Sequence, residues 1–172
     1  MLPIEWNFYV NFNPNSVSLR EPMAKASSNK SELNVLVVDD DENIRLVLQK
    51  TITKQGYHVS TARNAEEALN MLQRSFFHVV ITDIMMGEMN GLELMQQIKE
   101  INSLMQIYIM TAHSNLSHVI QAMKGGAHDY FEKPLQIEDI NATVNEAARR
   151  VTRWSELYNR HSRPPIATFE KG

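Results

Sequence analysis

Short hydrophobic runs alternate with amphipathic segments along the chain from residue 33 onward. Three of the runs, at 33–38, 79–83 and 106–110, are rich in aliphatic and β-branched residues, as in strands that are buried on both faces, and short strands are predicted at 57–61 and 127–131. Segments with apolar residues at helical spacing follow them, at 42–55, 65–74, 91–101, 114–124 and from 136 onward. Strands and helices that alternate in this way are joined by right-handed crossovers into a parallel sheet with both faces covered. The predicted fold class is therefore α/β, with a doubly wound five-stranded parallel sheet.

The two ends of the chain depart from this pattern. Hydrophobic and polar residues alternate with period two from Ile4 to Asn13, which predicts either an added strand or partner-docking segment, or an extension that never packs on the domain. Residues 18–32 are rich in Ser, Lys, Asn and Glu, as linkers are. We therefore expect an N-terminal extension over 1–32, a folded domain over 33–150 and a C-terminal extension over 151–172.

The last predicted helix is longer than the packing of such a domain requires. Its apolar spacing continues from Gln136 to about Asn159, and Val151, Trp154 and Tyr158 form one stripe beyond the domain. This stripe favours a dimerisation or partner helix, or a helix that leads to an output module. The alternative is a solvated helix end whose arginines complement the helix dipole. Too few residues follow Asn159 for a helix-turn-helix, so we expect no direct contact with nucleic acid from this chain.

Composition excludes several classes of site. The 172 residues include no cysteine, which excludes disulfides and thiolate metal sites, and the net charge of −3 gives no reason to expect nucleic acid or an anionic membrane. No apolar run approaches the roughly 20 residues of a membrane span, and no secretion signal opens the chain. A cytoplasmic protein without a membrane partner is expected.

Polar residues stand where four of the predicted strands end. Asp39 and Asp40 follow the first strand, Asp83 ends the third and Thr111 ends the fourth, while Lys133 follows the fifth. In open α/β sheets the site lies beyond the carboxyl ends of the strands. Carboxylates gathered there repel one another, and an oxygen-coordinated Mg²⁺ would offset that repulsion. Carboxylates, a metal, a lysine and a hydroxyl suit phosphoryl transfer to a carboxylate. Alternatively, each acid taken singly could simply cap a helix.

These residues carry a family resemblance. Residues 33–150 resemble a response-regulator receiver domain (CheY-like) of two-component signal transduction, which has a flavodoxin-like fold. The matching motifs agree in order and spacing and are Val37-Val38-Asp39-Asp40, Thr82-Asp83-Ile84-Met85-Met86 with Gly91 eight residues after Asp83, Met110-Thr111-Ala112, Gly125-Gly126-Ala127-His128-Asp129-Tyr130-Phe131 and Lys133-Pro134. One departure is Gly87, which stands where the family usually has proline.

The resemblance implies a role for each residue at the acidic end. Asp83 would be the phosphoacceptor. Mg²⁺ would be held by Asp40, Asp83 and the backbone carbonyl of Met85, with Asp39 acting largely through a metal-bound water.

The resemblance also implies a phosphoryl-binding pair and a switch. Thr111 and Lys133 would bind phosphoryl oxygens, and Tyr130 would be the aromatic residue that changes position on phosphorylation. The Ser114–Lys124 helix and the last strand and helix would then carry the altered surface.

The implied function is that of a response regulator rather than an enzyme. It would accept its phosphoryl group from a histidine kinase or a phosphotransfer protein, catalyse only its own slow phosphorylation and dephosphorylation, and could form a phosphorylation-dependent homodimer. Two alternatives stay open. One is a haloacid-dehalogenase-type phosphatase. Residues 39–43 weakly resemble the D-x-D-x-[T/V] motif of that family. The other is the receiver part of a longer transcription regulator.

Overall fold

The computed structural model describes residues 33–112 and 116–161, without the side chains of residues 116 and 158–161. Several predicted features lie outside these residues: the period-two segment 4–13, the linker 18–32, the first residues of the helix predicted from Ser114, and the tail after His161. The side chain of Tyr158 is outside them as well.

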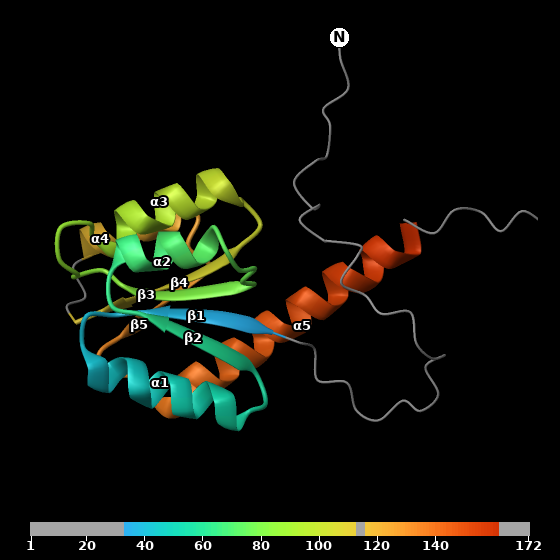
Figure 1. Ribbon diagram of the computed structural model, residues 1–172, viewed down its shortest axis with the longest axis horizontal. Helices are drawn as coiled ribbons and strands as arrows, with labels where there is room; N and C mark the ends of the chain where they lie inside the picture. The colour runs from blue at the N-terminus through green and yellow to red at the C-terminus, as the bar shows by residue number, and fades with distance from the viewer. Residues whose placement is uncertain (1–32, 113–115, 162–172) are drawn as a thin grey trace, which may run out of the picture.

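Five parallel strands form one sheet, and a helix follows each strand (Figure 1). The strands are β1 (Asn34–Val38), β2 (His58–Ala62), β3 (Val79–Asp83), β4 (Gln106–Thr111) and β5 (Asp129–Glu132). The helices are α1 (Glu42–Lys54), α2 (Ala65–Leu72), α3 (Gly91–Ile101), α4 (Leu116–Lys124) and α5 (Ile137–His161). The strand order is β2-β1-β3-β4-β5, and every neighbouring pair is parallel. The predicted doubly wound five-stranded parallel sheet is confirmed.

The helices cover both faces of the sheet, α1 and α5 on one side and α2, α3 and α4 on the other (Figure 1). Successive strand residues alternate between two cores. Leu36 and Val80 lie in the core under α2 and α3, whereas Val37 and Ile81 lie in the core under α1 and α5. All residues of β3 are buried, which explains why its sequence is a continuous apolar run rather than an alternating one.

Local signals set most element boundaries. Asn64 caps α2 by accepting a hydrogen bond from the backbone N–H of Glu67, and Gly56, at φ 88°, follows the end of α1 in the left-handed region that glycine favours. The strand predicted to start at Tyr57 starts one residue later, at His58, where pairing with Asn34 of β1 begins. The strand predicted over 127–131 is instead Asp129–Glu132.

Helix α5 is as long as its sequence pattern predicts, with 25 residues. Its first half packs on the sheet through Ile140, Val144 and Ala147, and the Ala147 carbonyl accepts a hydrogen bond of 3.2 Å from the Gln106 side chain at the start of β4. Farther along, Trp154 is 68% exposed. The end of α5 therefore projects beyond the sheet, toward the right in Figure 1.

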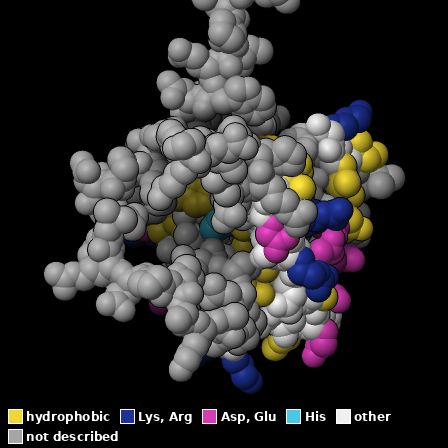
Figure 2. Space-filling view, turned by 90° about the vertical axis from the view of Figure 1, so that its right-hand side faces the viewer, with side chains coloured by type: hydrophobic (Ala, Val, Ile, Leu, Met, Phe, Trp, Pro, Cys, Tyr) yellow, Lys and Arg dark blue, Asp and Glu magenta, His cyan; other side chains and the backbone are white. Residues whose placement is uncertain are grey.

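Exposed hydrophobic side chains lie among charged ones on the described part of the face seen in Figure 2. Of the helices in the described residues, none has both the length and the apolar composition that crossing a membrane requires.

Candidate phosphoacceptor site

The carboxyl ends of β1, β3 and β4 bring the predicted polar residues to one edge of the sheet. Strands β1 and β3 pair up to Val38 and Thr82, so Asp39 and Asp83 follow at neighbouring positions. Both side chains are buried, as is that of Thr111 at the end of β4. The carboxylate of Asp40 is instead exposed on the loop after β1. The parallel register thus gathers residues that are far apart in sequence.

Gly91 allows the loop after Asp83 to turn back closely. Its N–H donates to the Ile84 carbonyl at 3.0 Å, and a Cβ atom at this position would lie 1.9 Å from the Asp83 carbonyl oxygen. Only glycine fits this approach without a backbone shift. In contrast, a Cβ at Gly87 would meet nothing within 4 Å, so the missing family proline leaves open space.

Lys133 joins the two buried carboxylates. Its Nζ atom lies 2.9 Å from Oδ2 of Asp39 and 2.9 Å from Oδ2 of Asp83, and its side chain is 18% exposed. The Lys133 backbone N–H also donates to the Thr111 carbonyl at 2.8 Å, which ties the loop after β5 to the end of β4. One ammonium group therefore faces two acids from different strands.

Burial and charge act in opposite directions on this cluster. Burial raises the pKa of Asp39, and the hydrogen bonds from Lys133 and from the Asp41 backbone offset only part of that rise. Burial alone would lower the pKa of Lys133, but its hydrogen bonds to Asp39 and Asp83 and their charges raise it overall. Lys133 is thus held as a cation, and a single positive charge leaves this acidic site undercompensated.

The acidic residues fit a divalent cation. One carboxylate oxygen from each of Asp39, Asp40 and Asp83 lies within 4.8 Å of the other two. Oδ1 of Asp83 is buried and accepts no hydrogen bond from any described residue, which is costly for a charged oxygen. Hard carboxylate oxygens in such a group are the ligands that Mg²⁺ prefers.

The other predicted residues surround the cluster at different depths. The Met85 side chain is 66% exposed, and the ligand that the family resemblance implies at this residue is its backbone carbonyl. Tyr130 on β5 is 41% exposed, with its backbone N–H bonded to the Asp129 carboxylate at 2.8 Å. Tyr130 therefore lies at the surface and is not packed against the acids.

Arg45 on α1 is a residue that the sequence interpretation missed. Its Nη1 atom donates to the carbonyls of Asp39, at 2.7 Å, and Asp40, at 3.0 Å. An arginine one turn into the helix that follows an acidic run is the only signal in the sequence, and it is a weak one.

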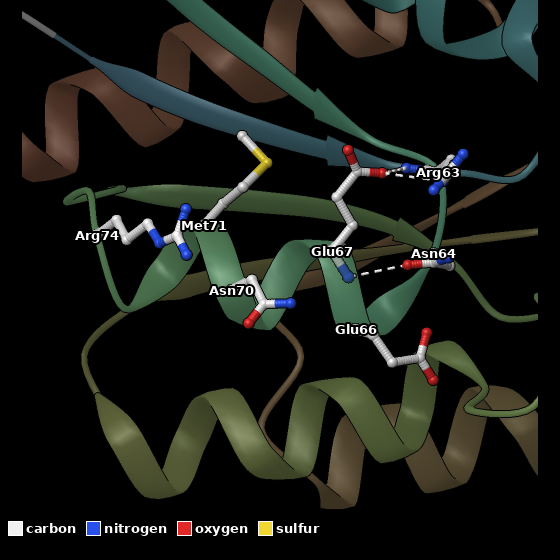
Figure 3. Close-up of a pocket in the computed structure, with 7 residues that line it drawn as sticks. All are labelled: Arg63, Asn64, Glu66, Glu67, Asn70, Met71 and Arg74. Atoms are coloured by element: carbon white, nitrogen blue, oxygen red, sulfur yellow. Dashed lines mark hydrogen bonds and ion pairs between the residues drawn. The ribbon is translucent and has the colours of Figure 1, made fainter.

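A separate hollow lies along α2 and does not adjoin the acidic cluster (Figure 3). Glu67 crosses it to Arg63, with 3.6 Å between the charged groups, and Arg74 lies at the opposite end. Among the described residues its one ion pair, Arg63–Glu67, lies at the surface, so the hollow offers no chemistry comparable to that of the buried acids.

Known proteins of one family resemble this chain. A family model described as the response regulator receiver domain matches residues 35–145. The chain is 38% identical over 125 residues to the transcriptional regulatory protein ZraR of Klebsiella oxytoca, a match that covers 73% of this chain and 28% of that protein. It is 40% identical over 113 residues to the DNA-binding transcriptional regulator NtrC of Escherichia coli K12, covering 66% of this chain and 24% of that protein. The chain thus spans about a quarter of the length of these relatives.

Solved structures of response regulators are also similar to this chain. The chemotaxis response regulator CheY4 of Vibrio cholerae has a TM-score of 0.64 and 28% identity, covering 68% of this chain and 99% of that one. A response regulator receiver domain from Clostridium thermocellum has a TM-score of 0.67 and 31% identity, covering 71% and 98%.

Proposed function

Since the chain belongs to the response regulator receiver domain family of two-component signalling, we propose that its Asp83 accepts a phosphoryl group from a histidine kinase or a phosphotransfer protein. The observation that supports this most is the arrangement of Asp83 itself. Its Oδ2 is held by Lys133 at 2.9 Å, whereas its buried Oδ1 has no partner among the described residues. Oδ1 is therefore the Asp83 oxygen that is open to the proposed Mg²⁺ and phosphoryl group.

The transfer needs positioning and charge more than a strong base. A lone pair of Asp83 forms the new bond to phosphorus, the bond from phosphorus to the donor's leaving atom breaks, and the leaving group keeps that electron pair. An ionised carboxylate can attack phosphorus directly, so no general base is required. The Lys133 ammonium and the Thr111 hydroxyl would donate to the phosphoryl oxygens as their charge is brought into the site.

Mg²⁺ is the cofactor that we propose for this site. Asp39, Asp40, Asp83 and the Met85 carbonyl would hold it, and it would supply the positive charge that the transferred group requires. Asp40→Ala should lower the Mg²⁺ affinity and the phosphorylation rate together, and Asp39→Ala should do so more mildly. If isothermal titration showed unchanged Mg²⁺ binding in both variants, the acidic residues would not be ligands.

Phosphorylation would change the surface through Thr111 and Tyr130. A phosphorylated Asp83 carries nearly two charges and strong acceptor oxygens, which would draw the Thr111 hydroxyl inward. The exposed Tyr130 ring would then move into the vacated space and alter the surface of α4 and β5.

Intact mass spectrometry after treatment with acetyl phosphate and Mg²⁺ tests the acceptor. Wild-type protein should gain the mass of one phosphoryl group, Asp83→Asn should gain none, and the exposed Asp129→Asn control should behave as wild type. Full labelling of Asp83→Asn would refute the assignment. Rapid turnover of an added phosphoester would instead support the haloacid-dehalogenase-type phosphatase, which the family match disfavours.

The partners of this domain follow from its family and from α5. The matched relatives are named as transcription regulators, and we propose that this chain serves as the receiver part of such a regulator, acting in the cytoplasm without itself binding nucleic acid. Along the projecting part of α5, Trp154 is 68% and Leu157 39% exposed. A phosphorylation-tuned homodimer that buries these side chains is the assembly we propose, since exposed aromatic and aliphatic groups on one helix favour a partner.

A further inference from the structure

Arg45 fastens the loop that carries Asp40. Strand β1 ends at Val38, so the next carbonyls no longer take part in the sheet and need other partners. Arg45 supplies them, because a single Nη1 nitrogen donates at 2.7 Å to the Asp39 carbonyl and at 3.0 Å to that of Asp40. The guanidinium reaches back from α1 across the loop and is half-buried there.

The rest of this loop is fixed at both of its ends. On one side, the Asp39 N–H donates to the Ala62 carbonyl at 3.2 Å, and the Asp39 carboxylate accepts from the Asp41 N–H at 2.9 Å. On the other, Asp41 caps α1, and its carbonyl accepts from the Arg45 N–H at 3.1 Å. Only the Asp40 side chain, between these anchors, makes no hydrogen bond or ion pair with the described part of the chain. The position available to the Asp40 carboxylate therefore depends on how the loop backbone is held.

We propose that Arg45 is a positioning residue for the acidic loop, which holds Asp40 where its carboxylate can bind Mg²⁺ together with Asp39 and Asp83. This inference rests on the proposed function of the site. Arg45 acts through the backbone of Asp40 and contacts neither the metal nor the phosphoryl group.

Two effects of Arg45 on Mg²⁺ binding have opposite signs, which makes the proposal testable. Positioning by groups that orient metal ligands changes metal affinity by about 10–100-fold, so loss of Arg45 would weaken binding. The positive charge of Arg45 repels the cation, so its loss would strengthen binding, but water screening at the exposed loop limits this to about fivefold. We expect the positioning effect to be larger than the charge effect. The direction of the change in Mg²⁺ affinity therefore distinguishes the two.

The experiment is isothermal titration of Mg²⁺ at pH 7 with the full chain. Arg45→Met removes the donors and the charge but keeps an unbranched apolar stem, and Arg45→Lys keeps a donor and the charge. Arg74→Met, at an exposed position in the turn after α2, is the matched control. We expect Arg45→Met to bind Mg²⁺ about 10-fold more weakly, and Arg45→Lys and Arg74→Met to stay within about threefold of wild type. Saturating Mg²⁺ should restore the labelling of Arg45→Met by acetyl phosphate, which a general loss of folding would not allow.

Coupling to Asp40 completes the test. Because Arg45 acts through Asp40, Asp40→Asn combined with Arg45→Met should weaken Mg²⁺ binding no more than Asp40→Asn alone. Unchanged or tighter Mg²⁺ binding by Arg45→Met would overturn the positioning role, as would full additivity with Asp40→Asn. If Arg45→Met does not fold, Arg45→Leu, which likewise lacks the donors and the charge, provides the same comparison. The proposed function itself would be refuted if wild-type protein neither bound Mg²⁺ nor accepted a phosphoryl group. The positioning role alone would be refuted if wild-type protein did both and Arg45→Met bound Mg²⁺ as tightly.

Discussion

Replacing Lys133 with methionine would remove the ammonium group that joins two buried carboxylates. Nζ lies 2.9 Å from Oδ2 of both Asp39 and Asp83, and the side chain is only 18% exposed. A hydrogen bond between charged groups contributes about 1.5–3 kcal/mol, and removing one partner of a buried pair costs about 3–5 kcal/mol. Since Asp40 is exposed beside the cluster, water reaches its edge, and we expect the lower end of this range. The free energy of unfolding at pH 7 without Mg²⁺ should fall by about 3 kcal/mol.

The dependence of this loss on pH follows from the carboxyl groups. Burial already raises the pKa of Asp39, and without Lys133 that pKa would rise further. At pH values between the ordinary carboxyl pKa and the raised pKa, the folded variant would then bind protons that the unfolded chain does not bind. The destabilisation should thus be complete above the raised pKa and diminish as the pH falls through it.

Urea unfolding followed by circular dichroism at pH 7 and pH 5, with and without Mg²⁺, measures these effects. Mg²⁺ should restore part of the stability of Lys133→Met, because a divalent cation supplies the missing positive charge. Lys50→Met, at an exposed position of α1, is the matched control and should change stability by about 0.5 kcal/mol or less. A loss below about 1 kcal/mol for Lys133→Met, or one that is the same at both pH values, would refute the electrostatic account.

Three further predictions concern other parts of the chain. Gly91→Ala should destabilise the fold by about 2–3 kcal/mol in urea unfolding and slow phosphorylation, because the new Cβ would lie 1.9 Å from the Asp83 carbonyl oxygen, whereas Gly87→Ala should be nearly neutral. Burial and nearby cationic groups lower the pKa of His128 to about 4, so folding stability should fall as the pH drops from about 6.5 to about 4. When the pKa shift is discounted for screening by water, His128→Asn should remove about 1–2 kcal/mol of that loss of stability. A variant whose stability depends on pH as that of wild type does would contradict the assignment. Trp154→Ala should weaken self-association of the beryllofluoride-treated protein in sedimentation, without affecting phosphorylation of the untreated protein. If the treated wild-type protein is also a monomer, the dimer is excluded.

The sequence alone determined the elements of this fold and the candidate residues of its site. The central strands β1, β3 and β4 could be recognised because strands covered on both faces require continuous apolar runs, as in the fully buried β3. The position of Asp83 at the end of such a run placed it at the edge where parallel sheets carry their sites. Turn and cap residues such as Gly56 and Asn64 act within a few positions of the backbone that they stabilise, so their effects could be predicted locally.

Tertiary structure decided which of these residues meet, and with what charge. The ion pair between Asp39 and Lys133 joins positions 94 residues apart, and no local pattern could show that the same ammonium also holds Asp83. The role of Arg45 was hidden for a related reason, since its partners are backbone carbonyls, which every residue has and no sequence marks. Periodicity likewise could not tell that Tyr130 lies outward, because a short strand at the sheet edge is covered only where neighbouring helices happen to reach it. Local interactions thus determined the elements, while the order of the strands and the crossovers between them determined the site.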